Sequence, residues 1–193
     1  MTQAMRVITA KAVFDGVNLL SNKAVLIADG VIIDLIDKDK VYDATQIEDF
    51  GNSVISAGLI DLQLNGNGGV LFNDSISFAS LETMHQTNLR FGTTSYLPTL
   101  ITSDLNDVRT ALEVTKEWFK QYGNTRGVIG LHLEVPFLSK EKRGIHPLEF
   151  VTLPTDAMLS EIASYTKYFP IKLTLAPENF KPEQISYLVK HGV

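Results

Sequence analysis

The stretch Leu131–Phe137, LHLEVPF, decides the fold, because its leucines alternate with two polar residues before a proline. Successive side chains of a β-strand point to opposite faces, so Leu131 and Leu133 share one face and His132 and Glu134 share the other. A carboxylate at the end of a strand is either a solvated charge or a ligand.

Two further segments show the same division into an apolar and a polar face. Gln63 and Asn65 lie on the polar face of residues 59–65, LIDLQLN, and Lys172 lies on that of residues 171–178, IKLTLAPE. The apolar faces comprise Ile60, Leu62 and Leu64 in the first segment and Ile171, Leu173 and Leu175 in the second. Helices cover both faces of an open doubly wound sheet, whereas a barrel with a polar site in its lumen has one polar face. The pattern therefore favours a (β/α) barrel.

Strands and helices alternate along the chain from about residue 51, which is typical of βα units around a parallel sheet. The predicted strands cover residues 54–65, 93–100, 127–135 and 171–177, and the predicted helices cover 78–91, 104–122 with Ser103 as N-cap, 156–168 and 182–190. The predicted fold class is α/β, with residues 54–193 forming the first four βα units, or first half, of a (β/α)8 TIM-like barrel. Gly192 and Val193 resemble a helix stop and the start of another strand, so we expect a truncated chain.

Residues 1–53 have a different pattern of short apolar runs. Asp29-Gly30 stands between two runs rich in β-branched residues, which is a strong hairpin signal. This region is predicted to be a small antiparallel sheet that forms a separate domain.

Composition excludes several classes of partner. The formal net charge is -5 and the pI is near 5.3, so a nucleic-acid backbone or an anionic membrane is a poor partner. Without cysteine, a metal site would have to be built from histidines, carboxylates and amides. No signal peptide or long apolar run is evident, and we expect a cytoplasmic location.

Glu134 is the sharpest candidate for chemistry, because active sites of barrels lie at the carboxyl ends of the strands. A carboxylate there suits zinc or another divalent ion, although an exposed carboxylate is the plain alternative. Gln63 and Asn65 could hold a metal-bound water or a polar substrate group by hydrogen bonds, or could simply cap the glycine-rich loop that follows.

The histidines offer weaker signals. His132 is expected to be buried in the lumen, where it would orient carboxylates rather than bind the metal. His146 lies in the long loop after the third strand, beside basic residues that suggest an anionic group nearby. His85 and His191 lie in predicted helices and receive no role.

Four segments together resemble the N-acetylglucosamine-6-phosphate deacetylase family of the amidohydrolase superfamily. They are ISAGLIDLQLNGNGGVLFND at 55–74, SYLPTLITS at 95–103, GLHLEVPFLSKEKRGIHP at 130–147 and LTLAPE at 173–178. The resemblance implies a (β/α)8 barrel with a small β-sandwich built from both chain ends, for which residues 1–53 would supply the amino-terminal part. It also implies hydrolysis of N-acetylglucosamine 6-phosphate to glucosamine 6-phosphate and acetate, in amino-sugar catabolism, by a full-length homodimer.

The resemblance also implies roles for particular residues. Gln63 and Asn65 match the Gln-x-Asn of the family's bacterial branch, and Glu134 matches its strand-three metal ligand. Ile145, through its backbone, and His146 match the loop that contacts substrate. The implied cofactor is a divalent metal ion, zinc first, with iron or manganese as alternatives, which activates water and polarises the amide carbonyl.

The family's remaining two histidine ligands and its general acid/base aspartate would lie beyond Val193, so we expect no catalytic residue within this chain and no activity from it alone. The chain departs from the family pattern at Val135, where the family has glycine, and at Ala57, where it has proline. A β-branched residue cannot readily replace a glycine that needs a positive φ.

Two other functions stay open. A non-catalytic half-barrel could persist by self-association that buries its open strand edges. Another amidohydrolase, such as a dihydroorotase-like enzyme, would normally carry His-x-His at the positions of Gln63 and Asn65, so those residues argue against it.

Overall fold

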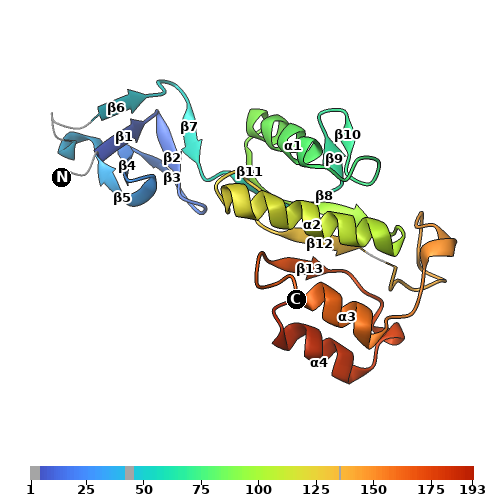
Figure 1. Ribbon diagram of the computed structural model, residues 1–193. Helices are drawn as coiled ribbons and strands as arrows, with labels where there is room; N and C mark the ends of the chain where they lie inside the picture. Colours follow the sequence, from blue (N-terminus) through green and yellow to red (C-terminus); the bar gives the residue numbers. More distant parts are fainter. Residues whose placement is uncertain (1–4, 42–45, 135) are drawn as a thin grey trace. The chain divides into compact units, whose positions relative to one another are not determined.

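The computed structural model describes residues 5–41, 46–134 and 136–193 (Figure 1). The chain divides into two compact units between Ala57 and Gly58. The position of Val135, where the family pattern has glycine, lies outside the described residues.

The first unit contains two small sheets. One has the strand order β5-β4-β1-β6 and the other has the order β3-β2-β7. Their strands are β1 (Met5–Thr9), β2 (Ala12–Phe14), β3 (Leu19–Ser21), β4 (Lys23–Ala28), β5 (Val31–Asp37), β6 (Gln46–Asp49) and β7 (Val54–Ser56). Asp29 and Gly30 connect β4 to β5 with φ angles of 51° and 78°, so the predicted hairpin is confirmed.

The two sheets of the first unit are mixed, so the predicted antiparallel sheet is confirmed for some strand pairs and wrong for others. β1 pairs antiparallel with β4 but parallel with β6, and β2 pairs antiparallel with β3 but parallel with β7. Parallel pairing is possible because long connections, rather than tight turns, separate these partners. The predicted strand 54–65 is accordingly two strands, of which β7 pairs within the first unit.

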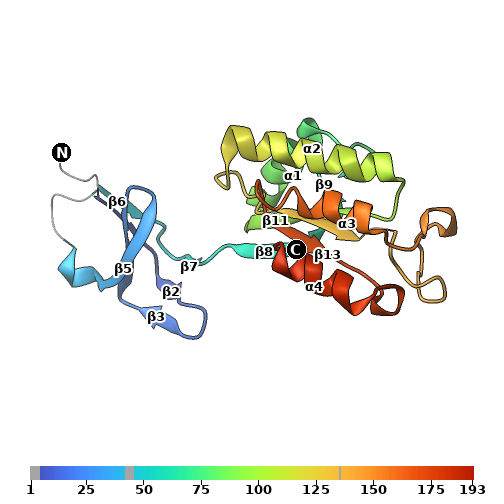
Figure 2. The ribbon, with the colours of Figure 1, turned by 60° about the horizontal axis from the view of Figure 1, so that its bottom comes forward.

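The second unit is built on a four-stranded parallel sheet with the order β13-β12-β11-β8. Its strands are β8 (Leu59–Leu64), β11 (Thr93–Ile101), β12 (Leu131–Glu134) and β13 (Ile171–Leu173), and its helices are α1 (Phe78–Arg90), α2 (Leu105–Tyr122), α3 (Asp156–Ala163) and α4 (Pro182–Lys190). A small hairpin, β9 (Gly66–Asn67) and β10 (Val70–Leu71), follows β8. The α/β class is thus confirmed, and Figure 2 shows α1 and α2 together on one side of the strands.

The helix boundaries follow local capping. α4 begins at Pro182, as predicted, because proline suits the first helical turn. The N-cap of α2 is Asp104 and not Ser103, since the Asp104 carboxylate accepts from two backbone N–H groups of the first turn. α3 ends at Ala163, earlier than predicted, because the next residues switch to i→i−3 bonds such as Tyr165 N to Ile162 O.

The alternation of β12 is confirmed by its packing. Leu131 and Leu133 are fully buried in the hydrophobic core, which is shared with Trp118 and Leu112 of α2. On β8, only Leu64 is buried. Ile60 and Leu62, which were predicted to face helices, are 62% and 51% exposed, because β8 is an edge strand of the sheet that the described residues form.

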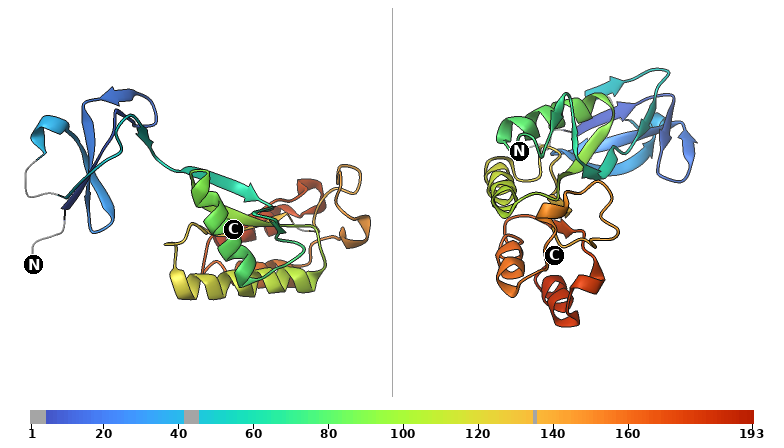
Figure 3. Two further views of the ribbon diagram at one scale, coloured as in Figure 1. Left: turned by 90° about the horizontal axis from the view of Figure 1, so that it is seen from above. Right: turned by 90° about the vertical axis from the view of Figure 1, so that its right-hand side faces the viewer.

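The parallel sheet is strongly curved. Lys172 Nζ on β13 donates to the carbonyl oxygen of Leu62 on β8 at 3.3 Å, although these strands form opposite edges of the sheet. Three strand spacings would separate the edges by about 14 Å in a flat sheet, beyond the reach of a lysine side chain. The right-hand view of Figure 3 shows the four helices in an arc along one side of the strands.

Candidate functional site

The carboxyl ends of the parallel strands bring together residues that are far apart in the sequence. Ile101 at the end of β11 pairs with Glu134 at the end of β12, and Pro98 of β11 pairs with Leu64 of β8. We call the group formed by Gln63, Thr102, Glu134 and His146 the carboxyl-edge site.

Gln63 and Glu134 meet across the intervening strand β11. Gln63 Nε2 donates to Glu134 Oε2 at 3.0 Å. The Gln63 backbone N–H is held by the Asp61 carboxylate at 2.9 Å. One oxygen of Glu134 is therefore fixed by an amide donor, which leaves Oε1 for another partner.

His146 folds back from the loop after β12 onto the same carboxylate. Its Nε2 lies 3.8 Å from Glu134 Oε1, and the two side chains are 12% and 19% exposed. Its Nδ1 lies 2.9 Å from Thr102 Oγ1. The structure thus places the predicted loop histidine beside the predicted metal ligand.

Thr102 is a member of the site that sequence patterns did not single out. It follows β11 directly, is 3% exposed, and donates from Oγ1 to the Glu134 carbonyl oxygen at 3.1 Å. Its place just after a strand of the parallel sheet, inside the SYLPTLITS segment, is the signal that could have identified it.

Asn73 is a second residue that the sequence did not reveal. Its side-chain Nδ2 donates to the Ile101 carbonyl oxygen and its Oδ1 accepts from the Ile101 N–H, both at 3.0 Å. The side chain therefore pairs with the end of β11 as a neighbouring strand would. It holds the glycine-rich loop against the end of the sheet.

His132 is fully buried, as predicted, but its contacts differ from the expectation. Its Nδ1 lies 3.1 Å from Thr99 Oγ1 and its Nε2 lies 2.8 Å from Thr174 Oγ1, so hydroxyls and not carboxylates occupy both nitrogens. Burial, with a smaller contribution from the charge of Lys172, lowers the pKa of His132 to about 4. The neutral ring ties β11, β12 and the residue after β13 together.

The structure does not bring every predicted residue to Glu134. Asn65 is exposed, and its backbone carbonyl oxygen accepts a hydrogen bond from Phe72 N at 2.8 Å. Ile145 is 90% exposed, and its neighbour His146 is the loop residue that reaches the carboxylate.

The donor set fits a divalent cation only in part. The carboxylate of Glu134 and the imidazole Nε2 of His146 are suitable zinc donors in type. Among the described residues there is no group of three or more His, Cys, Asp or Glu side chains that could hold a metal ion. Two donors fall short of the three protein ligands usual in catalytic zinc sites.

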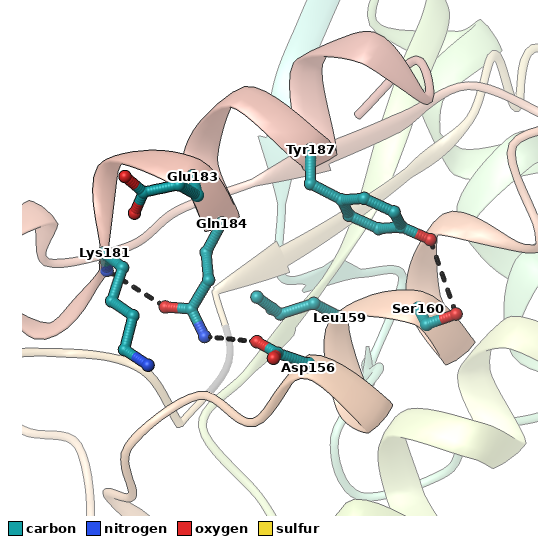
Figure 4. A pocket seen from close by; sticks show the side chains of 7 residues that line it. All are labelled: Asp156, Leu159, Ser160, Lys181, Glu183, Gln184 and Tyr187. Carbon is teal, nitrogen blue, oxygen red and sulfur yellow. Dashed lines mark hydrogen bonds between the residues drawn. The ribbon is translucent and has the colours of Figure 1, made fainter.

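A separate cavity of about 520 Å³ lies between α3 and α4 (Figure 4). Gln184 Nε2 donates to Asp156 Oδ1 at 2.8 Å, and Tyr187 OH lies 3.4 Å from Ser160 Oγ. Its lining contains none of the carboxyl-edge residues, so this cavity is not part of the candidate site. Within the described residues, every helix is too short or too polar to span a bilayer.

Two known proteins that are similar to this chain are deacetylases of amino-sugar phosphates. The chain is 35% identical over 176 residues to an N-acetylglucosamine-6-phosphate deacetylase of Haemophilus influenzae, covering 91% of this chain and 45% of that protein. It is 36% identical over 188 residues to an N-acetylgalactosamine-6-phosphate deacetylase of a Shewanella species, covering 95% and 46%. No protein-family model matches the chain.

A solved structure of such a deacetylase also has a similar fold. The crystal structure of N-acetylglucosamine-6-phosphate deacetylase from Pasteurella multocida superposes with a TM-score of 0.90 at 36% identity, over 98% of this chain and 49% of that one. The chain thus matches the amino-terminal portion of these deacetylases, and it spans about half the length of the relatives that it matches.

Proposed function

We propose that this chain supplies half of the active site of a metal-dependent deacetylase that hydrolyses the acetamido group of N-acetylglucosamine 6-phosphate. The observation that carries the proposal is the convergence of Gln63, Glu134 and His146 from three separate segments at the carboxyl edge of one sheet. The identity of the relatives supports the same reaction class.

In this proposal Glu134 binds a divalent ion, zinc first, and Gln63 fixes the carboxylate for that contact. A bound ion would supply Lewis-acid activation of water and of the amide carbonyl. Asn65, two residues after Gln63, holds a metal-bound water or a polar substrate group, and Ile145, through its backbone, and His146 bind the substrate. His132 supports the strands from within.

We further propose that the curved sheet is the first half of a (β/α)8 barrel and that the first unit belongs to a small β-sandwich. The curvature reported by the bond from Lys172 to Leu62 supports the barrel, as does the placement of all four helices on one side. We also propose that the full-length enzyme is a cytoplasmic homodimer.

The alternative substrate is N-acetylgalactosamine 6-phosphate, because glucosamine and galactosamine differ only in the configuration at C4. The two relatives described above, one named for each sugar, match this chain at nearly equal identity, 35% and 36%. The two N-acetylhexosamine 6-phosphates can be compared by titrating each into the chain in the presence of Zn²⁺. The NMR shifts of Gln63 and His146 report the binding. Stronger binding of N-acetylgalactosamine 6-phosphate would make that compound the proposed substrate in place of N-acetylglucosamine 6-phosphate.

The chain by itself should not catalyse the reaction, because one carboxylate and one imidazole do not complete a catalytic zinc site. The test is incubation of the chain with N-acetylglucosamine 6-phosphate and Zn²⁺ while acetate is measured, with EDTA and Glu134→Gln as controls. Acetate above the Glu134→Gln background would refute the proposed inactivity. Equal Zn²⁺ binding by the wild type and Glu134→Gln would refute the role of Glu134.

A second candidate is a non-catalytic protein that associates through its sheet edge. The observation in its favour is the exposure of Leu59, Ile60 and Leu62 on β8, each more than half exposed. Light scattering after size exclusion separates the two candidates. A single dimer that Ile60→Asp dissociates would favour self-association, whereas a monomer that binds Zn²⁺ favours the deacetylase half-site.

A further inference from the structure

The cavity between α3 and α4 is part of a longer groove. A second cavity, of about 420 Å³, adjoins it, and the two share Asp156, Lys181 and Gln184 in their linings. The bond from Gln184 Nε2 to Asp156 Oδ1 joins the two helices within this shared lining (Figure 4). Leu159, which is 1% exposed, and the ring of Tyr187 add apolar surface. We call the two cavities together the α3–α4 groove, and its interior suits an apolar side chain.

The charges of the α3–α4 groove are not balanced. Its lining contains one cation, Lys181, and three carboxylates, which are those of Asp156, Glu178 and Glu183. None of these four groups forms an ion pair with another described residue. Interfaces combine an apolar centre with a polar rim of complementary charge, so the groove suits a basic segment with an apolar anchor.

A segment of the same chain has this composition. Residues 140–145, KEKRGI, lie in the loop after β12, and their three cations are Lys140, Lys142 and Arg143. None of the three forms an ion pair within the part of the chain that the structure describes. The one carboxylate of the segment, that of Glu141, accepts from Ser139 Oγ at 3.1 Å. Ile145 is 90% exposed, so an apolar side chain stands beside the unpaired cations.

We propose that the α3–α4 groove binds residues 140–145 of a second copy of this chain, with the Ile145 side chain in the cavity and the cations at the acidic rim. Within one copy the segment does not occupy the groove, because none of its residues contributes to either lining. The backbone of Ile145 stays available for the role proposed above. The inference rests on the proposed function only for the homodimer, whose interface it specifies.

The segment and the groove lie at the same end of the second unit. Figure 1 shows the loop after β12 beside the starts of α3 and α4. Two copies related by a two-fold axis can therefore make the contact twice, each copy supplying one segment and one groove. Both contacts combine opposite charges, so the dimer should weaken as salt screens them.

An exchange of charges between two variants tests this interface. Lys140→Glu with Lys142→Glu reverses the charge of the segment, and Glu178→Lys with Glu183→Lys reverses that of the groove. All four side chains are exposed, so the fold should tolerate the changes. Asp156 is left in place because it bonds to Gln184. Light scattering after size exclusion measures the mass of each variant alone and of an equimolar mixture.

We expect the wild type to form a dimer at low salt. Each variant alone brings like charges together in both contacts, which should raise the dissociation constant of the dimer roughly 100-fold. In the mixture each segment faces a groove of opposite charge, so the two variants should form a mixed dimer with nearly the wild-type dissociation constant.

Two further variants separate the apolar anchor from the effect of net charge. Ile145→Ser removes the anchor and should raise the dissociation constant roughly 10-fold or more. Lys11→Glu with Lys120→Glu is the matched control, because it reverses two exposed cations that contribute to neither lining. The control should form a dimer as the wild type does.

A wild type that stays monomeric at low salt overturns the inference, and so does a mixture of the two variants that stays monomeric. A dimer that Ile60→Asp dissociates would place the contact on β8 instead. Circular dichroism reports whether each variant is folded, and Ile145→Ser decides if a charge-reversed variant does not fold. The association needs neither metal nor substrate, so failure of the Zn²⁺ and acetate assays would leave its result intact.

Discussion

Gln63 Nε2 donates a 3.0 Å hydrogen bond to Glu134 Oε2 although the two residues are 71 positions apart in the chain. They lie on β8 and β12, and β11 passes between those strands. The bond can form because the sheet is curved and both side chains point to its concave face. The bond therefore fixes the position of Glu134 Oε2, an oxygen of the proposed metal ligand, before any ion is present.

Removal of this bond should weaken metal binding. In Gln63→Leu the Glu134 carboxylate loses the donor that orients it, and supporting contacts of this kind change metal affinity by roughly 10-fold or more. Zn²⁺ titration against a competing chelator measures the effect. Gln86→Leu is the matched control, because Gln86 makes a similar 2.9 Å bond to Glu82 on α1, outside the site. Equal affinities in the two variants would contradict the role of Gln63.

Asn73 should matter for stability. Asn73→Ala removes two bonds and leaves the backbone groups of Ile101 unpaired, which should lower the free energy of unfolding by about 1–3 kcal/mol. Fluorescence of Trp118, the single and fully buried tryptophan, follows urea unfolding of the second unit. Asn124→Ala, at an exposed position, is the control. If Asn73→Ala lowers the free energy of unfolding no more than the control does, water has replaced the hydrogen bonds of the Asn73 side chain.

Gly66 should resist substitution for a steric reason. A Cβ at this position would lie 2.2 Å from the Val70 carbonyl oxygen and 2.7 Å from Leu71 Cα, both of which are backbone atoms of the β9–β10 hairpin. Gly69 has φ +84° but open space around it, so Gly69→Ala should incur only conformational strain, about 1 kcal/mol. We expect Gly66→Ala to be the more destabilising of the two by urea unfolding. If Gly69→Ala were the more destabilising, the β9–β10 hairpin would have moved to accommodate the new Cβ at Gly66 with little loss of unfolding free energy.

The ion pair between α2 and α3 should give a small, pH-dependent contribution. Arg109 Nε and Nη2 donate to the two oxygens of Glu161 at 2.7 and 3.0 Å, and these bonds lower the pKa of Glu161. Because the folded-state pKa is lower than the unfolded one, the stabilisation is present at neutral pH and is lost as the pH falls below about 4. Both side chains are partly exposed, so its size should not exceed about 1 kcal/mol.

The measurement is the difference in unfolding free energy between the wild type and Arg109→Met at pH 7 and near pH 3. The difference should shrink at the lower pH. Lys120→Met serves as the control, because Lys120 makes a longer 3.5 Å contact with Glu117 on the same exposed face. A difference that stays constant with pH would assign the effect to lost packing of the arginine side chain.

Several features were determined by the sequence itself because they depend on neighbouring residues. The Asp29-Gly30 turn follows from the ease with which these residues adopt positive φ, and the start of α4 follows from Pro182. The alternation in LHLEVPF correctly predicted that Leu131 and Leu133 enter the core. It also placed Glu134 at the end of a strand, where parallel strands expose their functional residues.

Other features were decided only by the tertiary structure. The parallel pairing of β6 and β7, the exposure of Ile60 and Leu62, and the meeting of Thr102, Glu134 and His146 all depend on segments distant in the chain. Periodicity assigns a side chain to a face of a strand, but it does not say which strand is an edge or how a sheet curves. The curvature of the sheet and the return of the loop after β12 set the distances between these side chains.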